Sequence, residues 1–482
     1  MGSIEPHLFN RKAMKDYNEF LNEKAQLSGE YGFEPVFMPD TLFPFQQALT
    51  AWALRKGRAA IFADCGLGKT FMSLVWAENV VRHTARRVLI ITPIAVGHQF
   101  VAEGEKFGIG CKVFRDGTPA GDITITNYER LHLFNPSDFI GVVCDESSIL
   151  KNYKGHTQRA VTDFLRKLPY RLTATATPAP NDPIELGTTS EAIGDLGAMD
   201  MLGKFFQNNE KSLHPAFIGS KWTFKPHAEM AFWKWVSSWA RAVRRPSDMG
   251  FEDNGFVLPE MTVNNIVIDR SEPLPGMLFS VPAIGRMEEL AERKVTLEQR
   301  CEKVSELVQS HDCSVVWGSL SPETELLAKL IPGSVDINGQ TSLEEREEKF
   351  MAFSAGQIKT LITKPKIGAF GMNWQHCAHM TFFPDHSYEQ FYQGTRRIWR
   401  FGQKRAVTVD VVMSEAQERT FENLHRKSKA ADKMFAVLVE YMNQGQRMQN
   451  QISYDQPIIV PTWLTGKSQQ INTRSTTGTA FR

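Results

Sequence analysis

Residues 63–70 read Ala-Asp-Cys-Gly-Leu-Gly-Lys-Thr, and this stretch decides the fold class. An apolar run, Ala59–Ala63, leads into it and a helical pattern follows it, so the glycines fall between an expected strand and an expected helix. In that context backbone N–H groups wrap phosphate oxygens, a lysine reaches the β- and γ-phosphates, and a threonine hydroxyl holds Mg²⁺. The pattern therefore predicts an ATP·Mg²⁺ site at the start of a helix. Its expected ligands are Gly66, Gly68, Lys69 and Thr70.

Around this loop, strand-like runs alternate with helical stretches. In the first half the expected strands are Ala59–Ala63, Val88–Thr92, Ile123–Thr126, Gly141–Cys144 and Arg171–Thr175. In the second half they are Ser314–Gly318, Gly333–Ile337, Lys359–Thr363, His379–Phe383 and Val407–Val412. Helices are expected at Thr70–Val81, Gln158–Leu168, Glu288–Gln309 and Leu343–Phe353. Such alternation predicts an α/β protein of two lobes, each a parallel sheet with helices on both faces.

Composition agrees with a protein of two or three domains. The chain has 482 residues, of which 42% are hydrophobic and 23% charged, and its net charge of +1 neither demands nor excludes a nucleic-acid partner. The six cysteines form no C-x-x-C pair, which fits a reducing compartment and speaks against a structural metal. The first residues lack the basic-then-apolar layout of a secretory signal, and no apolar run has membrane length. We expect a cytoplasmic protein.

The chain divides into five expected segments. A polar lead-in covers residues 1–40, the first lobe 41–195 and the second lobe 263–440. Between the lobes, residues 196–262 are rich in Trp and Phe, for which we expect a small separate core, and residues 441–482 have the polar composition of a flexible tail. Basic residues in or beside the aromatic segment leave open a surface for DNA or a protein partner: Lys221, Lys225, Lys234, Arg241, Arg244 and Arg245.

Two carboxylates, Asp145 and Glu146, directly follow the expected strand Gly141–Cys144. Ligands collect at the carboxyl ends of strands in open parallel sheets. A pair of acids there can divide the work: Asp145 holds Mg²⁺ and Glu146 polarises the attacking water.

A third feature lies far along the chain, where residues 393–403 read Gln-Gly-Thr-Arg-Arg-Ile-Trp-Arg-Phe-Gly-Gln. Arg397 and Arg400 are one helical turn apart. Phosphoryl transfer is accelerated about 10³–10⁵-fold when a guanidinium from a separate element neutralises charge on the γ-phosphate. We therefore expect both arginines to meet the phosphate loop in a cleft between the lobes. The neighbouring Arg396 is expected to point to solvent or to an acidic surface.

Taken in order over about residues 42–429, these segments resemble the motifs of superfamily 2 helicases, specifically the Swi/Snf-type branch of double-stranded-DNA translocases. Leu42–Gln46 resembles the adenine-recognition segment, Ile91–Pro93 and Thr126–Glu129 the motifs touching the DNA backbone, and Thr175–Pro178 the coupling motif. Gly368–Asn373 resembles a loop contacting DNA and nucleotide, and residues 393–403 match the branch's last motif. The resemblance implies two RecA-like lobes. It also implies Gln46, Gly371 and Gln403 at the nucleotide, Thr175 and Thr177 in coupling, and Thr92, Pro93, Asn127, Tyr128, Lys366 and Asn373 at DNA.

One departure concerns coupling. Ser147-Ser148 stands where relatives have Ala-His, so a hydroxyl must take over the link that the imidazole makes there. With that sequence the chain looks most like the compact DEAD/DEAH-box-like members encoded by tailed phages and prophages. The resemblance implies ATP, Mg²⁺ and duplex or branched DNA, with RNA open, a monomeric motor, and work in phage DNA replication or recombination within the host cytoplasm. A protein partner could use the aromatic segment or the tail.

Three function classes remain open on sequence alone. The first is an ATP-driven DNA translocase or remodelling enzyme. The second is a strand-separating helicase on DNA or RNA, which shares the motor but needs a wedge. The third is an ATP-switched module that recruits a partner without translocating. The intact Glu146, Arg397 and Arg400 argue against the third.

Overall fold

The computed structural model describes residues 29–93, 96–114, 116–119, 121–151, 155–209, 222–269, 286–368 and 372–452. Most of the expected lead-in and most of the expected tail lie outside these residues. So do two residues with expected roles, Lys221 and Gly371.

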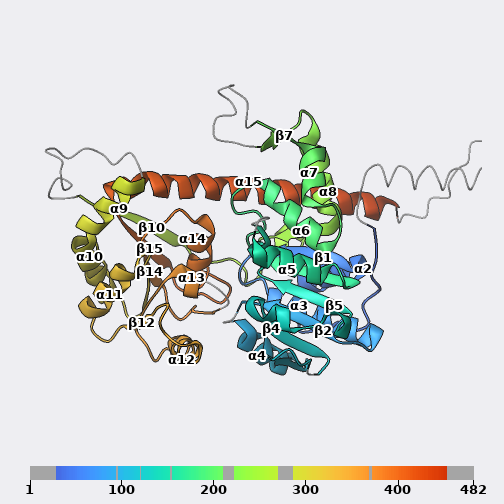
Figure 1. Ribbon diagram of the computed structural model, residues 1–482, viewed down its shortest axis with the longest axis horizontal. Helices are drawn as coiled ribbons and strands as arrows, with labels where there is room; N and C mark the ends of the chain where they lie inside the picture. Colours follow the sequence, from blue (N-terminus) through green and yellow to red (C-terminus); the bar gives the residue numbers. More distant parts are fainter. Residues whose placement is uncertain are drawn as a thin grey trace, which may run out of the picture. The chain divides into compact units, whose positions relative to one another are not determined.

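The first lobe is built on a parallel sheet of strand order β3-β4-β2-β5-β6-β1-β9 (Figure 1). Its strands are β1 (Arg58–Ala63), β2 (Val88–Thr92), β3 (Cys111–Val113), β4 (Ile123–Asn127), β5 (Gly141–Asp145), β6 (Tyr170–Thr175) and β9 (Ala240–Val243). Its helices include α2 (Pro44–Lys56), α3 (Lys69–Thr84), α4 (Gly97–Phe107), α5 (His156–Leu165), α6 (Leu186–Ile193), α7 (Ala198–Phe205) and α8 (Ala228–Trp239).

Helices cover both faces of this sheet because its strands are apolar on both faces. In β2, Val88 and Ile90 pack with α2, α3 and α4, whereas Leu89 and Ile91 pack on the opposite side with α5. Successive side chains of a strand point to opposite faces, so a strand that is buried on both faces reads as a continuous apolar run. That run is the signal by which the sequence predicted β2.

The second lobe repeats the plan. Its sheet has the order β10-β15-β14-β11-β13-β12, again with all neighbours parallel. The strands are β10 (Met261–Ile268), β11 (Ser314–Trp317), β12 (Val335–Ile337), β13 (Thr360–Thr363), β14 (His379–Phe382) and β15 (Val407–Ser414). The helices are α9 (Arg286–Val295), α10 (Leu297–Gln309), α11 (Ser321–Leu330), α12 (Leu343–Ser354), α13 (Pro365–Gly368), α14 (Tyr388–Thr395) and α15 (Glu415–Ile452). The expectation of two parallel-sheet α/β lobes is confirmed.

The aromatic segment differs from its prediction. Its strand β9 pairs with β1 and so completes the first lobe's sheet. The tryptophans of α8 pack with Ala60 and Phe62 of β1 and with Met434 and Phe435 of α15. The prediction of a separate small core is therefore wrong, since these aromatic side chains pack into the core of the first lobe.

Helix α15 links the two cores. Its Phe421 and Leu424 pack in the second lobe's core, and its Leu438 and Met442 pack in the cluster around α8. The helix continues to Ile452, past residue 441, where the sequence predicted a flexible tail.

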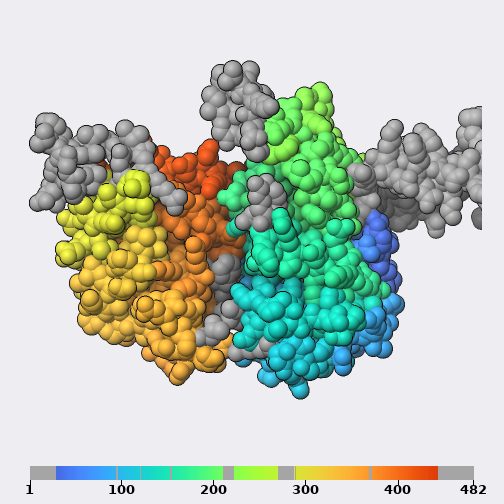
Figure 2. Space-filling view, in the orientation of Figure 1, coloured from blue at the N-terminus to red at the C-terminus, as the bar shows by residue number. Residues whose placement is uncertain are grey.

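Figure 2 shows the first lobe as a block of blue to green surface and the second as yellow to orange. Apart from α15, each lobe is thus made by one contiguous stretch of chain. No described helix has both the length and the apolar composition needed to cross a membrane.

Candidate active site

The phosphate loop lies between β1 and α3, as expected. Gly66 has φ 90° and Gly68 has φ 79°, in the left-handed region that glycine adopts without strain. A Cβ on Gly66 would come within 2.9 Å of the Phe401 backbone nitrogen, and one on Gly68 within 2.4 Å of the Gln46 side-chain nitrogen. Both positions therefore require glycine for backbone conformation and for space.

Two side chains hold the loop in this form. Lys69 Nζ donates to the carbonyl oxygen of Ala63 at 2.9 Å. Gln46 Nε2 donates to the carbonyl oxygen of Leu67 at 2.9 Å, while its Oε1 accepts from the Phe43 N–H at 3.0 Å. Gln46 thus ties the start of α2 to the phosphate loop, a contact that the sequence did not predict. Its expected role in reading adenine stays a prediction.

The acidic pair lies at the carboxyl end of β5, of which Asp145 is the last residue. Thr92 Oγ1 donates to Asp145 Oδ2 at 3.3 Å, and burial together with the neighbouring Glu146 raises the pKa of Asp145 to about 7. Glu146 has φ 53°, a left-handed conformation that is costly for a residue with a side chain and tends to occur at functional sites. The turn aims both carboxyl groups into one cavity with Lys69 and Thr70.

Of the two residues expected in coupling, Thr175 contacts Glu146 directly and Thr177 contacts Thr175. Thr175 Oγ1 donates to Glu146 Oε2 at 3.4 Å and accepts from the Thr177 N–H at 3.1 Å. Ser147 Oγ is buried without a hydrogen-bond partner in the structure. The expectation that a hydroxyl of Ser147-Ser148 replaces the imidazole stays a prediction, because Ser148 is the residue at the histidine position.

Arg397 and Arg400 both lie in the turn that follows α14. Both donate from Nη1 to the carbonyl oxygen of Met372, each at 3.2 Å. Burial and the charge of Arg397 lower the pKa of Arg400 to about 10. Among the described residues, no carboxylate forms an ion pair with either arginine. A buried guanidinium, that of Arg397, and a half-buried one, that of Arg400, therefore lie side by side without an ion-pair partner in the described part of the chain.

These groups line one cavity of about 210 Å³. Its wall comes from the phosphate loop, α4, the acidic pair and the second lobe, and includes Gly66, Gly68, Lys69, Thr70, Asp145, Glu146, Asn373, Arg397 and Arg400. Gln46 and Gln403 are not part of the wall; the Gln403 amide donates instead to the carbonyl oxygens of Cys377 and Ile398. The structure thus brings most of the expected nucleotide and catalytic residues together.

The residues expected at DNA are dispersed. Thr92 is buried on Asp145, and Tyr128 is 7% exposed, with its hydroxyl bonded to the Asp145 carbonyl oxygen and near Cys144. For these two we correct the expectation, because their side chains support the acidic strand and offer almost no surface. Asn127 accepts from the Arg130 N–H at 3.0 Å. Lys366 is exposed, whereas Pro93 and Asn373 are half-buried.

The basic residues of the aromatic segment differ in burial and in partners. Arg241 is buried, with its guanidinium 4.4 Å from the centroid of the Trp52 ring, and Arg244 pairs with Asp432 at 2.8 Å. Lys234 is exposed, whereas Lys225 is half-buried and its ammonium group donates to the carbonyl oxygen of Gly203. A DNA surface on this segment would therefore depend on the lysines and not on these two arginines.

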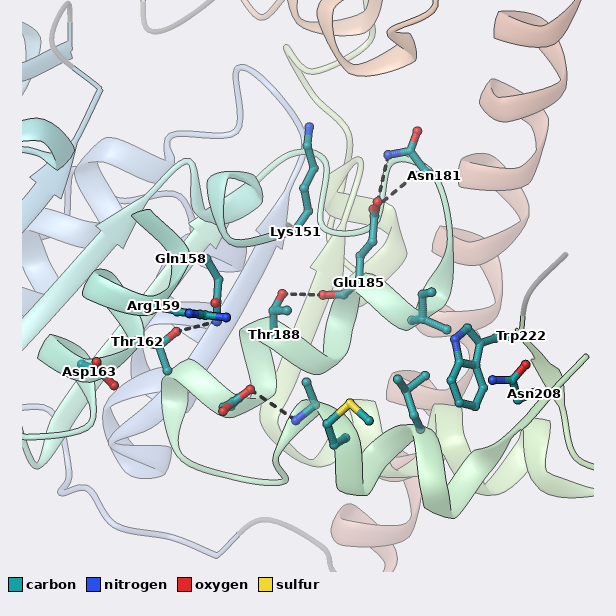
Figure 3. Close-up of a pocket in the computed structure, with 15 residues that line it drawn as sticks. Lys151, Gln158, Arg159, Thr162, Asp163, Asn181, Glu185, Thr188, Asn208 and Trp222 are labelled. Carbon is teal, nitrogen blue, oxygen red and sulfur yellow. Dashed lines mark hydrogen bonds between the residues drawn. The ribbon is translucent and has the colours of Figure 1, made fainter. Parts of the chain in front are cut away.

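A larger cavity of about 760 Å³ lies on the first lobe among α5, α6, α7 and β8 (Trp222–Phe224) (Figure 3). Asn181 Nδ2 donates to Glu185 Oε1 at 2.8 Å on one side of it, and Trp222 lies on another. Its wall contains no residue of the phosphate loop or of the acidic pair. The residues expected to carry the chemistry line the smaller cavity.

That smaller cavity fits a triphosphate and Mg²⁺. The glycines of the phosphate loop line it, two guanidinium groups without an ion-pair partner supply positive charge, and a hydroxyl and a carboxylate are hard oxygen ligands of the kind that Mg²⁺ prefers. A cation beside Asp145 would also favour its charged form.

Several contacts that the sequence did not predict join the lobes here. Lys151 forms an ion pair with Glu389 of α14, and Thr177 Oγ1 donates to Glu389 at 3.5 Å. Arg396, expected at solvent or an acidic surface, pairs instead with Asp64 at 2.6 Å. The only sequence signal for these pairs was the presence of opposite charges in two of the motifs.

No protein-family model matches the chain. Over 196 residues it is 28% identical to a protein of Bacillus subtilis (strain 168) described as an uncharacterized ATP-dependent helicase. The match covers 37% of this chain and 34% of that protein, so the chain matches about a third of the relative's length. Among solved structures, the SWI2/SNF2 ATPase core of Sulfolobus solfataricus in complex with dsDNA aligns over 84% of this chain and 96% of that one, with 18% identity and a TM-score of 0.40. With so low a score, the fold assignment rests on the two sheets themselves.

Proposed function

We propose that this protein is an ATP-driven motor that moves along or remodels DNA. The observation that carries the proposal is the pair Arg397, which is buried, and Arg400, which is half-buried: both line one cavity with the phosphate loop and the acidic pair, and neither forms an ion pair with a described carboxylate. Buried charges are normally paired, because an isolated charge loses hydration that nothing replaces. A binding site for a polyanion resolves this cost, and the γ-phosphate of ATP is an anion that the glycine loop can place there.

The chain's residues then divide the chemistry. The loop backbone and Lys69 hold the phosphates, while Thr70 and Asp145 are the residues that would hold Mg²⁺. When bound, Mg²⁺ neutralises charge on the phosphates and orients them. Glu146 orients the attacking water and accepts its proton, and the two guanidinium groups stabilise charge that develops on the transferred phosphoryl group.

The work on DNA follows from the two-lobed arrangement. Because the phosphate loop and the arginines belong to different lobes, nucleotide binding favours closure and product release permits opening. Contacts to DNA phosphates carry no sequence information, which suits a protein that steps along DNA. Pro93, Asn127, Lys366 and Asn373 are the proposed contacts. Similarity to an ATP-dependent helicase and to a SWI2/SNF2 core with dsDNA is in keeping with this proposal.

Duplex or branched DNA is the proposed substrate, and phage replication or recombination the proposed pathway, both supported by the resemblance of the motifs. The test is steady-state ATPase without nucleic acid and with single-stranded, duplex or forked DNA, or RNA. Lys69→Ala serves as the blank. We expect the strongest stimulation by duplex or forked DNA. Stimulation by single strands or RNA alone would replace the proposal with a strand-separating helicase, and ATP binding without stimulation would replace it with an ATP-controlled recruiting module.

A further inference from the structure

Three side chains on α14 and the turn after it reach the first lobe. Glu389, Tyr392 and Arg396 are spaced by three and four residues, which places them on one face of a helix. Glu389 contacts Lys151, which follows the acidic pair in the sequence, and Thr177, which belongs to the coupling motif. Tyr392 and Arg396 both meet Asp64. One face of a second-lobe helix thus touches two functional segments of the first lobe.

Asp64 of the first lobe accepts hydrogen bonds from both Tyr392 and Arg396 of the second lobe. Its Oδ2 accepts from Arg396 Nη2 at 2.6 Å, and its Oδ1 accepts from the Tyr392 hydroxyl and from the Cys65 N–H, the latter at 2.6 Å. The Asp64 side chain is 6% exposed and that of Arg396 12%. Burial alone would lower the pKa of Arg396, but the charge of Asp64 more than reverses this and raises it. Both charges are satisfied only while the lobes are in contact.

Asp64 is also part of the phosphate loop. Its carbonyl oxygen accepts from the Leu67 N–H at 3.3 Å and lies 3.4 Å from Lys69 Nζ. A displacement of Asp64 therefore moves the groups that face the phosphates.

Arg396 is directly followed by Arg397, which enters the nucleotide cavity. The two adjacent arginines thus have different partners: Arg396 meets the base of the phosphate loop, and Arg397 meets Met372 on the cavity wall. Since they share one backbone, the Arg396–Asp64 pair fixes how far Arg397 lies from Lys69.

We propose that Arg396 is a positioning residue, whose ion pair with Asp64 clamps the arginine-bearing turn onto the phosphate loop and so places Arg397 for hydrolysis. This deepens the proposed function and rests on it for the effect on turnover. The clamp itself is a property of the fold. Misplacement of a catalytic group by about 1 Å can lower a rate about 10²-fold.

The test compares wild type with Arg396→Ala, Asp64→Asn and the double variant. The more conservative Arg396→Lys is a fourth variant, and Lys404→Ala is a matched control, because Lys404 is exposed on the same loop. Two readouts are taken: amide hydrogen exchange of peptides covering residues 64–70 and 88–92, and ATPase kcat and KM.

We expect exchange at residues 64–70 to rise in both single variants and no further in the double variant, while residues 88–92 stay protected. In ATPase assays, kcat should fall about 10²-fold with KM changed less than about threefold, non-additively in the double variant, and Arg396→Lys should recover part of the loss. Lys404→Ala should match wild type.

Unchanged exchange and kcat in Arg396→Ala would overturn the proposal. So would equal loss of protection at both peptides, because that would mark a purely structural residue. If wild type hydrolyses no ATP with any nucleic acid, the proposed function fails while the exchange data still decide the clamp.

Discussion

Two pairs of arginines in the second lobe, all buried except the half-buried Arg400, have opposite surroundings. Arg300 and Arg293 donate to Glu323, whose other oxygen accepts the N–H groups of Ser319 and Leu320 at 2.9 and 2.8 Å. Arg397 and Arg400 have only the Met372 carbonyl oxygen in common and no carboxylate partner in the described part of the chain. The difference separates arginines that stabilise the lobe from arginines placed to bind an anion.

The largest expected effect is on turnover and comes from Arg397, one of the two arginines without a carboxylate partner. Arg397→Ala should lower the DNA-stimulated kcat about 10³-fold or more, because the transition state loses the guanidinium that neutralises the γ-phosphate. Steady-state ATPase measures this, with Arg426→Ala, an exposed arginine of α15, as the matched control. Turnover near the wild-type value would remove Arg397 from the catalytic site.

For Arg300 and Arg293, which pair with Glu323, we expect a substitution to lower stability. Arg300→Ala should lower the free energy of unfolding by about 3–5 kcal/mol, since it strips the buried Glu323 carboxylate of its closest charge partner. Urea denaturation followed by tryptophan fluorescence measures the change. A loss below about 1 kcal/mol would show that the ion pair at Glu323 adds little to the lobe.

Stabilisation by a bound ATP analogue should also depend on Arg397 and Arg400. At a hundred times its Kd, a non-hydrolysable ATP analogue with Mg²⁺ should stabilise the wild type by about 2.7 kcal/mol. At the same concentration, the double variant Arg397→Ala/Arg400→Ala should gain measurably less, because the analogue loses two cationic partners. Thermal or urea unfolding with and without the analogue gives both values. Equal stabilisation of the two proteins would place the γ-phosphate elsewhere.

The smallest effect concerns pH. Burial would raise the pKa of Glu323, but the charges of Arg300 and Arg293 more than offset this and lower it below its ordinary value. A carboxyl with a lowered folded-state pKa contributes stability that is present above about pH 4.3 and is lost as the pH falls through the folded pKa. Wild type should thus lose more stability than Glu323→Gln between pH 5 and pH 3, on the order of 1 kcal/mol. Parallel acid-unfolding curves would contradict the assignment.

Sequence alone predicted the strands that are continuous apolar runs and the motifs that carry the nucleotide chemistry. It missed β9, whose Ala-Arg-Ala-Val sequence shows no such run and whose Arg241 is buried against Trp52. It also joined α9 and α10 into one helix. Between them, the buried Thr296 hydroxyl donates back to the Glu292 carbonyl oxygen at 2.9 Å and accepts from Arg300, a local arrangement that periodicity does not reveal.

The contacts between lobes were also beyond the sequence. Asp64 and Arg396 are more than three hundred residues apart, and within its motif each is a charged residue with no expected role in the nucleotide chemistry. Helical spacing groups Glu389 with Tyr392 and Arg396 on one face, but only the tertiary structure shows what that face meets. Long-range pairing of single charges leaves no periodic pattern to read.

The most direct test of the account measures kcat and the free energy of unfolding for Arg397→Ala and Arg300→Ala side by side, at a temperature where both are folded. We expect a crossover. Arg397→Ala should lose about 10³-fold in turnover and at most about 1 kcal/mol of stability, whereas Arg300→Ala should lose about 3–5 kcal/mol and keep turnover within about tenfold. If Arg397→Ala instead lost stability and kept turnover, the unpaired arginines would be structural, and the proposed nucleotide site would be contradicted.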